Sequence, residues 1–266
     1  MKVLKLASCM AENTDALCHS VAALLDTELG IHTEYVTGIP WQEREQLFDA
    51  GEIDILWLCG LPYVDKAALA GVGMELLAVP VPSHPRYQGR AVYYSDVVVH
   101  RNSAFESFLD LRGAAFVYNE PRSHSGFNVV RAYLAEFGQR DGFFGRVVEP
   151  GAHARSIEMI LSDDVDTAAI DSTVLEWLQA RDPELAGKLR VVEVIGPSPI
   201  PPWVVSTTLP DVIRCRVRQL LLNLHSASRG ESALAPTQLA KFIPADDRDY
   251  DPIRRMASAA RKVLLA

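Results

Sequence analysis

The stretch EREQLFDAGEIDILWLCGLPY, residues 43–63, decides the fold. Glu43–Ala50 is predicted to be a helix, and Gly51 ends it, because glycine readily adopts the backbone conformation that follows a helix. Ile53–Cys59 is a largely apolar run of strand length, which is typical of a strand buried inside a sheet. A helix leading directly into a buried strand indicates an α/β fold with a parallel sheet.

The residues before this stretch show the same alternation of strand and helix. Val3–Ala7 is a short apolar run, Asn13-Thr14-Asp15 offers a helix cap, and Gly30 closes the helix. His32–Thr37 predicts a second strand. Apolar residues recur at helical spacing between cap and glycine, at Leu17, Val21, Leu24, Leu25 and Leu29.

The pattern changes near Tyr93. Ser103–Glu106 has the spacing of a capping box and predicts a short helix. Gly196–Pro202 is dense in proline, and helices are predicted after it at Pro210–Leu224 and from Asp251 to the end. Short strands are predicted between these points, at Val97–Val99, Ala114–Tyr118, Val147–Val148, Asp166–Asp171 and Val191–Ile195.

We therefore expect two α/β lobes, with the second inserted into the first. The expected boundaries are residues 1–92 with 196–266 for lobe I and residues 93–195 for lobe II. Ligands of such folds bind at the carboxyl ends of parallel strands. Two facing sheets would place a ligand in a central cleft between the lobes.

Composition narrows the classes of partner. The chain has 266 residues, a net charge of −8, 48% hydrophobic and 23% charged residues, as expected for a globular protein. An acidic chain is a poor partner for nucleic acid or an anionic membrane. A small anion stays possible, because a few local N–H groups suffice to bind it.

Several kinds of site are not indicated. The four cysteines and seven histidines have no metal-ligand spacing, and no nucleotide-binding glycine motif is present, so we expect no metal and no cofactor. No apolar run reaches the roughly 18 residues of a membrane span. The start MKVLKLASC, broken by Lys5, is expected to be a first strand, which makes the chain cytoplasmic as written. A chain whose leader had been removed would look the same and would be periplasmic or extracellular.

The loop Ser123-His124-Ser125-Gly126 lies between a predicted strand and a predicted helix. A hydroxyl at the helix N-cap and a glycine that permits close approach suit a phosphate-like anion, since helix N-termini carry partial positive charge. Ordinary helix capping by the same serines is the alternative.

Several segments resemble one family. They are LDLRGAAFVYN at 109–119, SHSG at 123–126, GAH at 151–153, VDTAAID at 165–171, GEIDILWLCGLPY at 51–63 and YDPIRRM at 250–256. Together they resemble the phosphonate-binding family, the substrate-binding proteins of ABC transporters, over roughly residues 34–260. The resemblance implies a type II periplasmic-binding-protein fold.

The resemblance also implies ligand contacts. Tyr63 would supply a phenol from the first lobe, and Ser123, His124, Ser125 and the N–H of Gly126 would hold the anion from the second. The family often has threonine where this chain has His124. This histidine is either merely exposed or donates to the anion and makes affinity depend on pH.

Two further positions follow from the same resemblance. His153, in a Gly-x-His turn, would reach the ligand, or else be a surface or capping histidine. Asp171 would face the ligand from a strand end, or else cap the next helix. Aminophosphonate binders of the family place an acidic residue after the histidine, where this chain has Ala154 and then Arg155, so the ligand is expected to lack an amine.

The leading hypothesis is non-enzymatic binding of a small phosphonate- or phosphate-like oxyanion, with an ABC permease as a partner. The alternative is an enzyme on the same fold, of the menaquinone- or thiamine-precursor type, using His153 and Asp171 as acid and base. A hydrolase built from Ser125, His153 and Asp171 lacks the expected GxSxG turn.

Overall fold

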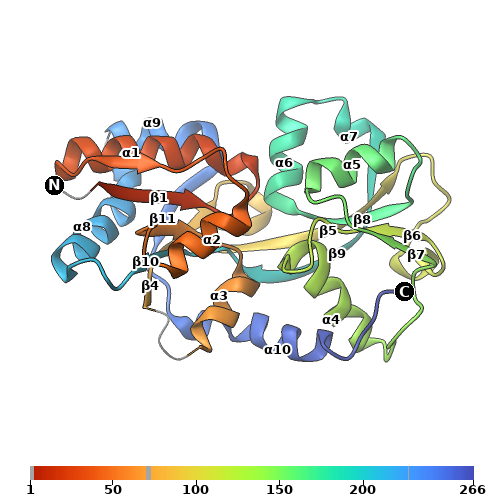
Figure 1. The fold of residues 1–266 in the computed structure, drawn as a ribbon. Helices are drawn as coiled ribbons and strands as arrows, with labels where there is room; N and C mark the ends of the chain where they lie inside the picture. The colour runs from red at the N-terminus through yellow and green to blue at the C-terminus, as the bar shows by residue number, and fades with distance from the viewer. Residues whose placement is uncertain (1–2, 70–72, 227) are drawn as a thin grey trace. The chain divides into compact units, whose positions relative to one another are not determined.

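The computed structural model describes residues 3–69, 73–226 and 228–266. The chain divides into two compact units, each an α/β unit with its own sheet (Figure 1). Unit 1 comprises Met1–Val92 and Pro199–Tyr250, and unit 2 comprises Tyr93–Ser198 and Asp251–Ala266.

Unit 1 is built on a six-stranded sheet of order β11-β4-β10-β3-β1-β2. β1 pairs in parallel with β2 and β3, whereas β10 and β11 are antiparallel to their neighbours. The strands are β1 (Leu4–Ser8), β2 (Thr33–Tyr35), β3 (Ile55–Trp57), β4 (Met74–Pro82), β10 (Trp203–Ser206) and β11 (Leu239–Ile243). The helices are α1 (Asp15–Leu29), α2 (Trp41–Asp49), α3 (Gly60–Ala67), α8 (Asp211–Leu222) and α9 (Ser228–Leu234).

The predicted elements of the first 63 residues are present. Gly30 ends α1 in the left-handed conformation, with φ of 63°, as expected of a glycine after a helix. Ile53–Cys59 contains β3, and its apolar side chains pack into the core of unit 1. That core joins the sheet to α1, α8 and α9, through residues that include Leu17, Leu25, Trp57, Trp203 and Leu221.

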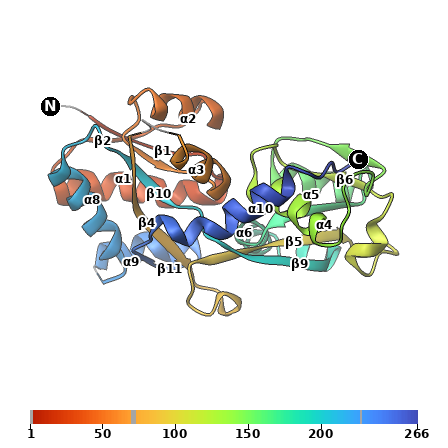
Figure 2. The ribbon, with the colours of Figure 1, turned by 90° about the horizontal axis from the view of Figure 1, so that it is seen from below.

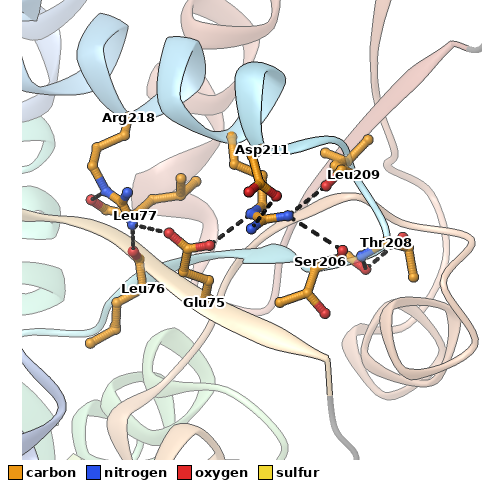
Figure 3. A network of polar contacts seen from close by, with 10 residues as sticks. Glu75, Leu76, Leu77, Ser206, Thr208, Leu209, Asp211 and Arg218 are labelled. Carbon is orange, nitrogen blue, oxygen red and sulfur yellow. Dashed lines mark hydrogen bonds and ion pairs between the residues drawn. The ribbon is translucent and has the colours of Figure 1, made fainter.

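A charged network fixes α8 to β4 (Figure 3). Glu75 accepts from Arg214 Nε at 2.7 Å and from Arg218 Nη2 at 2.5 Å. The same arginines donate to backbone carbonyls, among them Leu209 and Leu76. Burial raises the pKa of the Glu75 carboxyl, but the hydrogen bonds and charges of the two arginines outweigh burial and lower this pKa overall.

Glu75→Gln is expected to destabilise the protein by about 2 kcal/mol at neutral pH, since hydrogen bonds between charged groups are lost. The stability that Glu75 contributes is present above its unfolded-state pKa and is lost as pH falls through the lower folded-state pKa. The variant should therefore lose less stability than wild type between about pH 5 and pH 3. Urea unfolding across this range measures both effects. Asp211→Asn, which removes an exposed partner of Arg214, is the control and should have little effect.

Unit 2 is built on a five-stranded sheet of order β7-β6-β8-β5-β9. β6 is parallel to β7 and β8, and β5 is antiparallel to β8. The strands are β5 (Val92–His100), β6 (Ala115–Val117), β7 (Arg146–Val148), β8 (Thr167–Asp171) and β9 (Leu189–Pro199). The helices are α4 (Val129–Glu136), α5 (His153–Leu161), α6 (Ser172–Arg181), α7 (Leu185–Lys188) and α10 (Asp251–Ala260), with a π-helical turn, η4 (His124–Asn128), directly before α4.

The C-terminal helix corrects the expected boundaries. Lobe I was expected to include residues 196–266, but α10 packs against α4 in unit 2 (Figure 2). Val263 and Leu265, beyond α10, lie in the same hydrophobic cluster as Phe116 and Phe144 of unit 2. The side chains of Val263 and Leu265 are therefore buried in the core of unit 2.

Two local predictions are also corrected. The capping box lies at Ser107 and Asp110, not at Ser103–Glu106, and it begins the 3-10 turn Phe108–Leu111. This register buries Phe108 and Leu111 in the core. The strand predicted at Val191–Ile195 continues to Pro199 as β9, which is possible because β9 lies at the edge of the sheet, where proline is tolerated.

Within the described ranges, no helix has both the length and the apolar character that crossing a membrane requires.

Candidate functional site

Six of the seven predicted site residues lie in unit 2. Ser123 is the N-cap of η4, and its Oγ accepts the backbone N–H of Gly126 at 3.0 Å. This is ordinary helix capping. The N–H of Gly126, which was predicted to hold the anion, is therefore already bonded to Ser123 in this structure.

Ser125 and His153 form a pair at the same place. Ser125 Oγ lies 3.2 Å from His153 Nε2 and 3.4 Å from Ser123 Oγ. His153 is the first residue of α5, and its Nδ1 is buried with no hydrogen-bond partner in the described part of the chain. Burial lowers the pKa of His153 to about 4, so the ring is neutral at pH 7. A neutral imidazole has one N–H and a serine has one O–H, and the hydrogen bond between them uses one of these two donors. The other donor, Nδ1–H or the Ser125 O–H depending on the tautomer, remains for a ligand.

Asn119 was not predicted, and it adjoins this pair. A Cβ on Gly126 would lie 2.0 Å from Asn119 Oδ1 and 3.3 Å from His153 Cε1. Oδ1 of Asn119 is buried and has no partner among the described residues. A side chain at position 126 would therefore displace the Asn119 amide and press on the His153 ring. The available signal was that Asn119 directly follows a predicted strand, at its carboxyl end.

His124 corrects a prediction. Its ring is fully buried, not exposed, with Nδ1 3.0 Å from Asn128 Nδ2 and Nε2 3.0 Å from Ser198 Oγ. Because Nδ2 of an amide only donates, Nδ1 accepts, and Nε2–H donates to Ser198. Burial lowers the pKa of His124 to about 3, so this residue gives no pH dependence near neutrality. The ring joins η4 to β9, and neither of its nitrogens is left to donate to an anion.

Asp171 ends β8 and caps α6. Its Oδ1 accepts from the backbone N–H and the hydroxyl of Thr173, at 2.8 and 2.7 Å. Burial raises the pKa of Asp171 to about 6, and the nearby charge of Asp96 acts in the same direction. η4, which carries Ser125, and α5, which begins at His153, both contact β8, the strand that Asp171 ends.

Asp171→Asn is expected to stabilise the ligand-free protein at pH 7.5 by on the order of 2 kcal/mol, since one pKa unit is worth about 1.4 kcal/mol. The folded-state pKa is raised, so the stability contributed by the protonated carboxyl is complete below the unfolded value and is lost as pH rises through about 6. Asparagine cannot ionise and still accepts from Thr173. Urea unfolding at pH 4 and 7.5 should show the gain only at the higher pH. Asp141→Asn, at an exposed position, is the control and should have little effect. Equal stability of wild type and Asp171→Asn at pH 7.5 would contradict the prediction.

Tyr63 lies in unit 1, on α3. Its hydroxyl donates to Asp247 Oδ1 at 2.8 Å, and its ring lies 4.5 Å from that of Tyr250. The phenolic proton expected for a ligand is therefore given to a carboxylate in this structure. A role for Tyr63 in binding stays a prediction.

The two residues directly after His153, Ala154 and Arg155, carry no acidic side chain. Arg155 is exposed, and its Nη1 lies 2.8 Å from Glu158 on the same helix. Its charge is thus paired outside the cluster of Ser123, Ser125 and His153. Among the residues that the structure places, no three His, Cys, Asp or Glu side chains are grouped as metal ligands would be.

Comparison with known proteins gives a consistent result. Residues 8–250 match the family model described as "ABC transporter, phosphonate, periplasmic substrate-binding protein". The phosphonates-binding periplasmic protein of Escherichia coli K12 is 25% identical over 217 residues, which cover 77% of this chain but only 60% of that protein's length.

Solved structures show the same fold. A binding protein component of a phosphonate ABC transporter from Pseudomonas aeruginosa is 20% identical with a TM-score of 0.84, over 97% of this chain and 86% of that one. PhnD1 from Prochlorococcus marinus, solved with methylphosphonate, is 20% identical with a TM-score of 0.85, over 98% and 99% of the two chains. These likenesses confirm the predicted fold class, α/β of the type II periplasmic-binding-protein kind.

Proposed function

The chain belongs to the family of periplasmic substrate-binding proteins of phosphonate ABC transporters, and from this membership we propose that it binds a small phosphonate- or phosphate-like oxyanion without transforming it. The observation that carries the proposal is the Ser125–His153 pair, which has one donor to spare and a buried Nδ1 that no described residue hydrogen-bonds. Buried neutral donors stabilise an oxyanion, because hydrogen bonds to a charged partner are the stronger ones.

The ligand of this proposal has no amine. Ala154 and Arg155 leave no carboxylate directly after His153, and an ammonium group buried without a counter-charge is costly. Asp171 favours an oxyanion that retains one proton, since an ionised carboxylate accepts a hydrogen bond from P–OH but repels P–O⁻.

The partner of this proposal is the permease of an ABC transporter, and the place of action is outside the cytoplasmic membrane. Family membership supports both statements. The state of His153 does not favour the alternative hypothesis of an enzyme. His153 has a pKa of about 4 and shares Nε2 with Ser125, which makes it a poor general base at neutral pH.

Calorimetric titration tests the proposal. Phosphate, phosphite, methylphosphonate and 2-aminoethylphosphonate are titrated into the protein at pH 7, and recovered ligand is examined by mass spectrometry. We expect at least one of the first three to bind more tightly than the aminophosphonate and to be recovered unaltered. Absence of binding by all four would refute the function, and a chemically changed ligand would favour the enzyme.

A further inference from the structure

Ser95, near the start of β5, carries a buried hydroxyl oxygen to which no described residue hydrogen-bonds. The residue is 1% exposed, and its Oγ has no hydrogen-bond partner among the residues described. A buried hydroxyl without a partner costs stability, and alanine would occupy the same position without that cost. Ser95 is therefore unexplained by packing alone.

The position of Ser95 points to the anion site. Ser95 pairs in register with Asp171 across β5 and β8, so the two side chains leave the sheet on the same face. Tyr93 and Val97 lie two residues before and after Ser95 and share its face of the sheet, so their contacts show which segments cover that face. The ring of Tyr93 lies 6.4 Å from that of His124 in η4, and Val97 packs in one cluster with Val129 at the start of α4. Ser95 thus lies beside Asp171 and beneath the segment that holds Ser125.

We propose that Ser95 is a further ligand-contacting residue, whose hydroxyl hydrogen-bonds the oxyanion oxygen that lies next to Asp171. This inference rests on the proposed function and extends its site to the strand β5. A hydroxyl both donates and accepts, so it satisfies a ligand oxygen whether or not that oxygen carries a proton. Together with the carboxylate of Asp171, it suits a monoprotonated tetrahedral phosphorus oxyanion.

Ser95→Ala tests the proposal, and Ser103→Ala is the matched control. Ser103, just beyond the other end of β5, also has a buried Oγ with no partner in the described structure. Methylphosphonate is titrated calorimetrically at pH 7, and thermal unfolding of each ligand-free variant is followed. Ser95→Ala should weaken binding about tenfold to a hundredfold, with an unfolding midpoint equal to or above that of wild type. Ser95→Thr, which keeps the hydroxyl, should recover part of the affinity, and Ser103→Ala should bind as wild type.

The outcomes separate the inference from the function. Wild-type affinity in Ser95→Ala, combined with weaker binding in Ser125→Ala, would overturn the role of Ser95 and leave the proposed function intact. Weak binding accompanied by a lowered unfolding midpoint would show a structural role instead and would also overturn it. If wild type binds neither methylphosphonate nor the other oxyanions, the proposed function itself is wrong.

Discussion

Gly126→Ala is expected to weaken oxyanion binding at least a hundredfold, about 2.7 kcal/mol or more. The added methyl would lie 2.0 Å from Asn119 Oδ1 and 3.3 Å from His153 Cε1, so the amide of Asn119 must turn away and the imidazole must shift. Binding groups need to stay within about 0.5 Å of their productive positions. Calorimetric titration of methylphosphonate measures the loss, and unfolding should show a smaller destabilisation of about 1–3 kcal/mol.

Gly187→Ala is the matched control, because a Cβ there meets nothing within 4 Å and its φ is not in the left-handed region. It lies on α7 in the same unit and should bind as wild type. Binding by Gly126→Ala within threefold of wild type would show that the contacts of Asn119 and His153 with Gly126 do not shape the site.

Ser125→Ala is expected to weaken binding roughly tenfold to a hundredfold, since a hydrogen bond to a charged partner is worth about 1.5–3 kcal/mol. The change removes one proton of the Ser125–His153 pair and frees Nε2, which lies 3.2 Å from Oγ in wild type. The imidazole then keeps a single donor whose orientation is no longer fixed. Titration with phosphate and methylphosphonate measures the effect.

Ser162→Ala, an exposed serine of unit 2, serves as its control and should leave affinity unchanged. If Ser125→Ala binds both anions as tightly as wild type, the anion does not contact this hydroxyl. The site would then have to be sought elsewhere, while the family assignment would be unaffected.

Local patterns could be predicted because they depend on nearby residues. Gly30 ends α1 through its own backbone conformation, and the apolar run at Ile53–Cys59 contains β3 because it matches a buried strand. The position of the capping box was predicted wrongly because Ser103–Glu106 and Ser107–Asp110 have the same spacing. Only the burial of Phe108 and Leu111 favours the box at Ser107–Asp110.

The site was predicted in outline but not in orientation. The sequence brought Ser125 and His153 together through family resemblance, and the structure places them in contact. It could not show which way His124 points, since its ring is fixed by Ser198, 74 residues away in the chain. Asn119 is recognised only from its closeness to Gly126 in the structure. Ser95 is recognised only from its buried hydroxyl, which has no partner among the described residues.

Because α10 belongs to unit 2, its position affects when unit 2 can fold during protein synthesis. The chain passes between the units three times, after residues 92, 198 and 250. The core of unit 2 includes Val263 and Leu265, and the backbone N–H of Phe144 donates to the carbonyl of Leu265 at 3.0 Å. When residues 93–198 have emerged from the ribosome, Val263 and Leu265 have not yet been synthesised, so the core of unit 2 is still incomplete. Unit 2 can therefore complete its core only after residues 251–265 have emerged, long after residues 93–198.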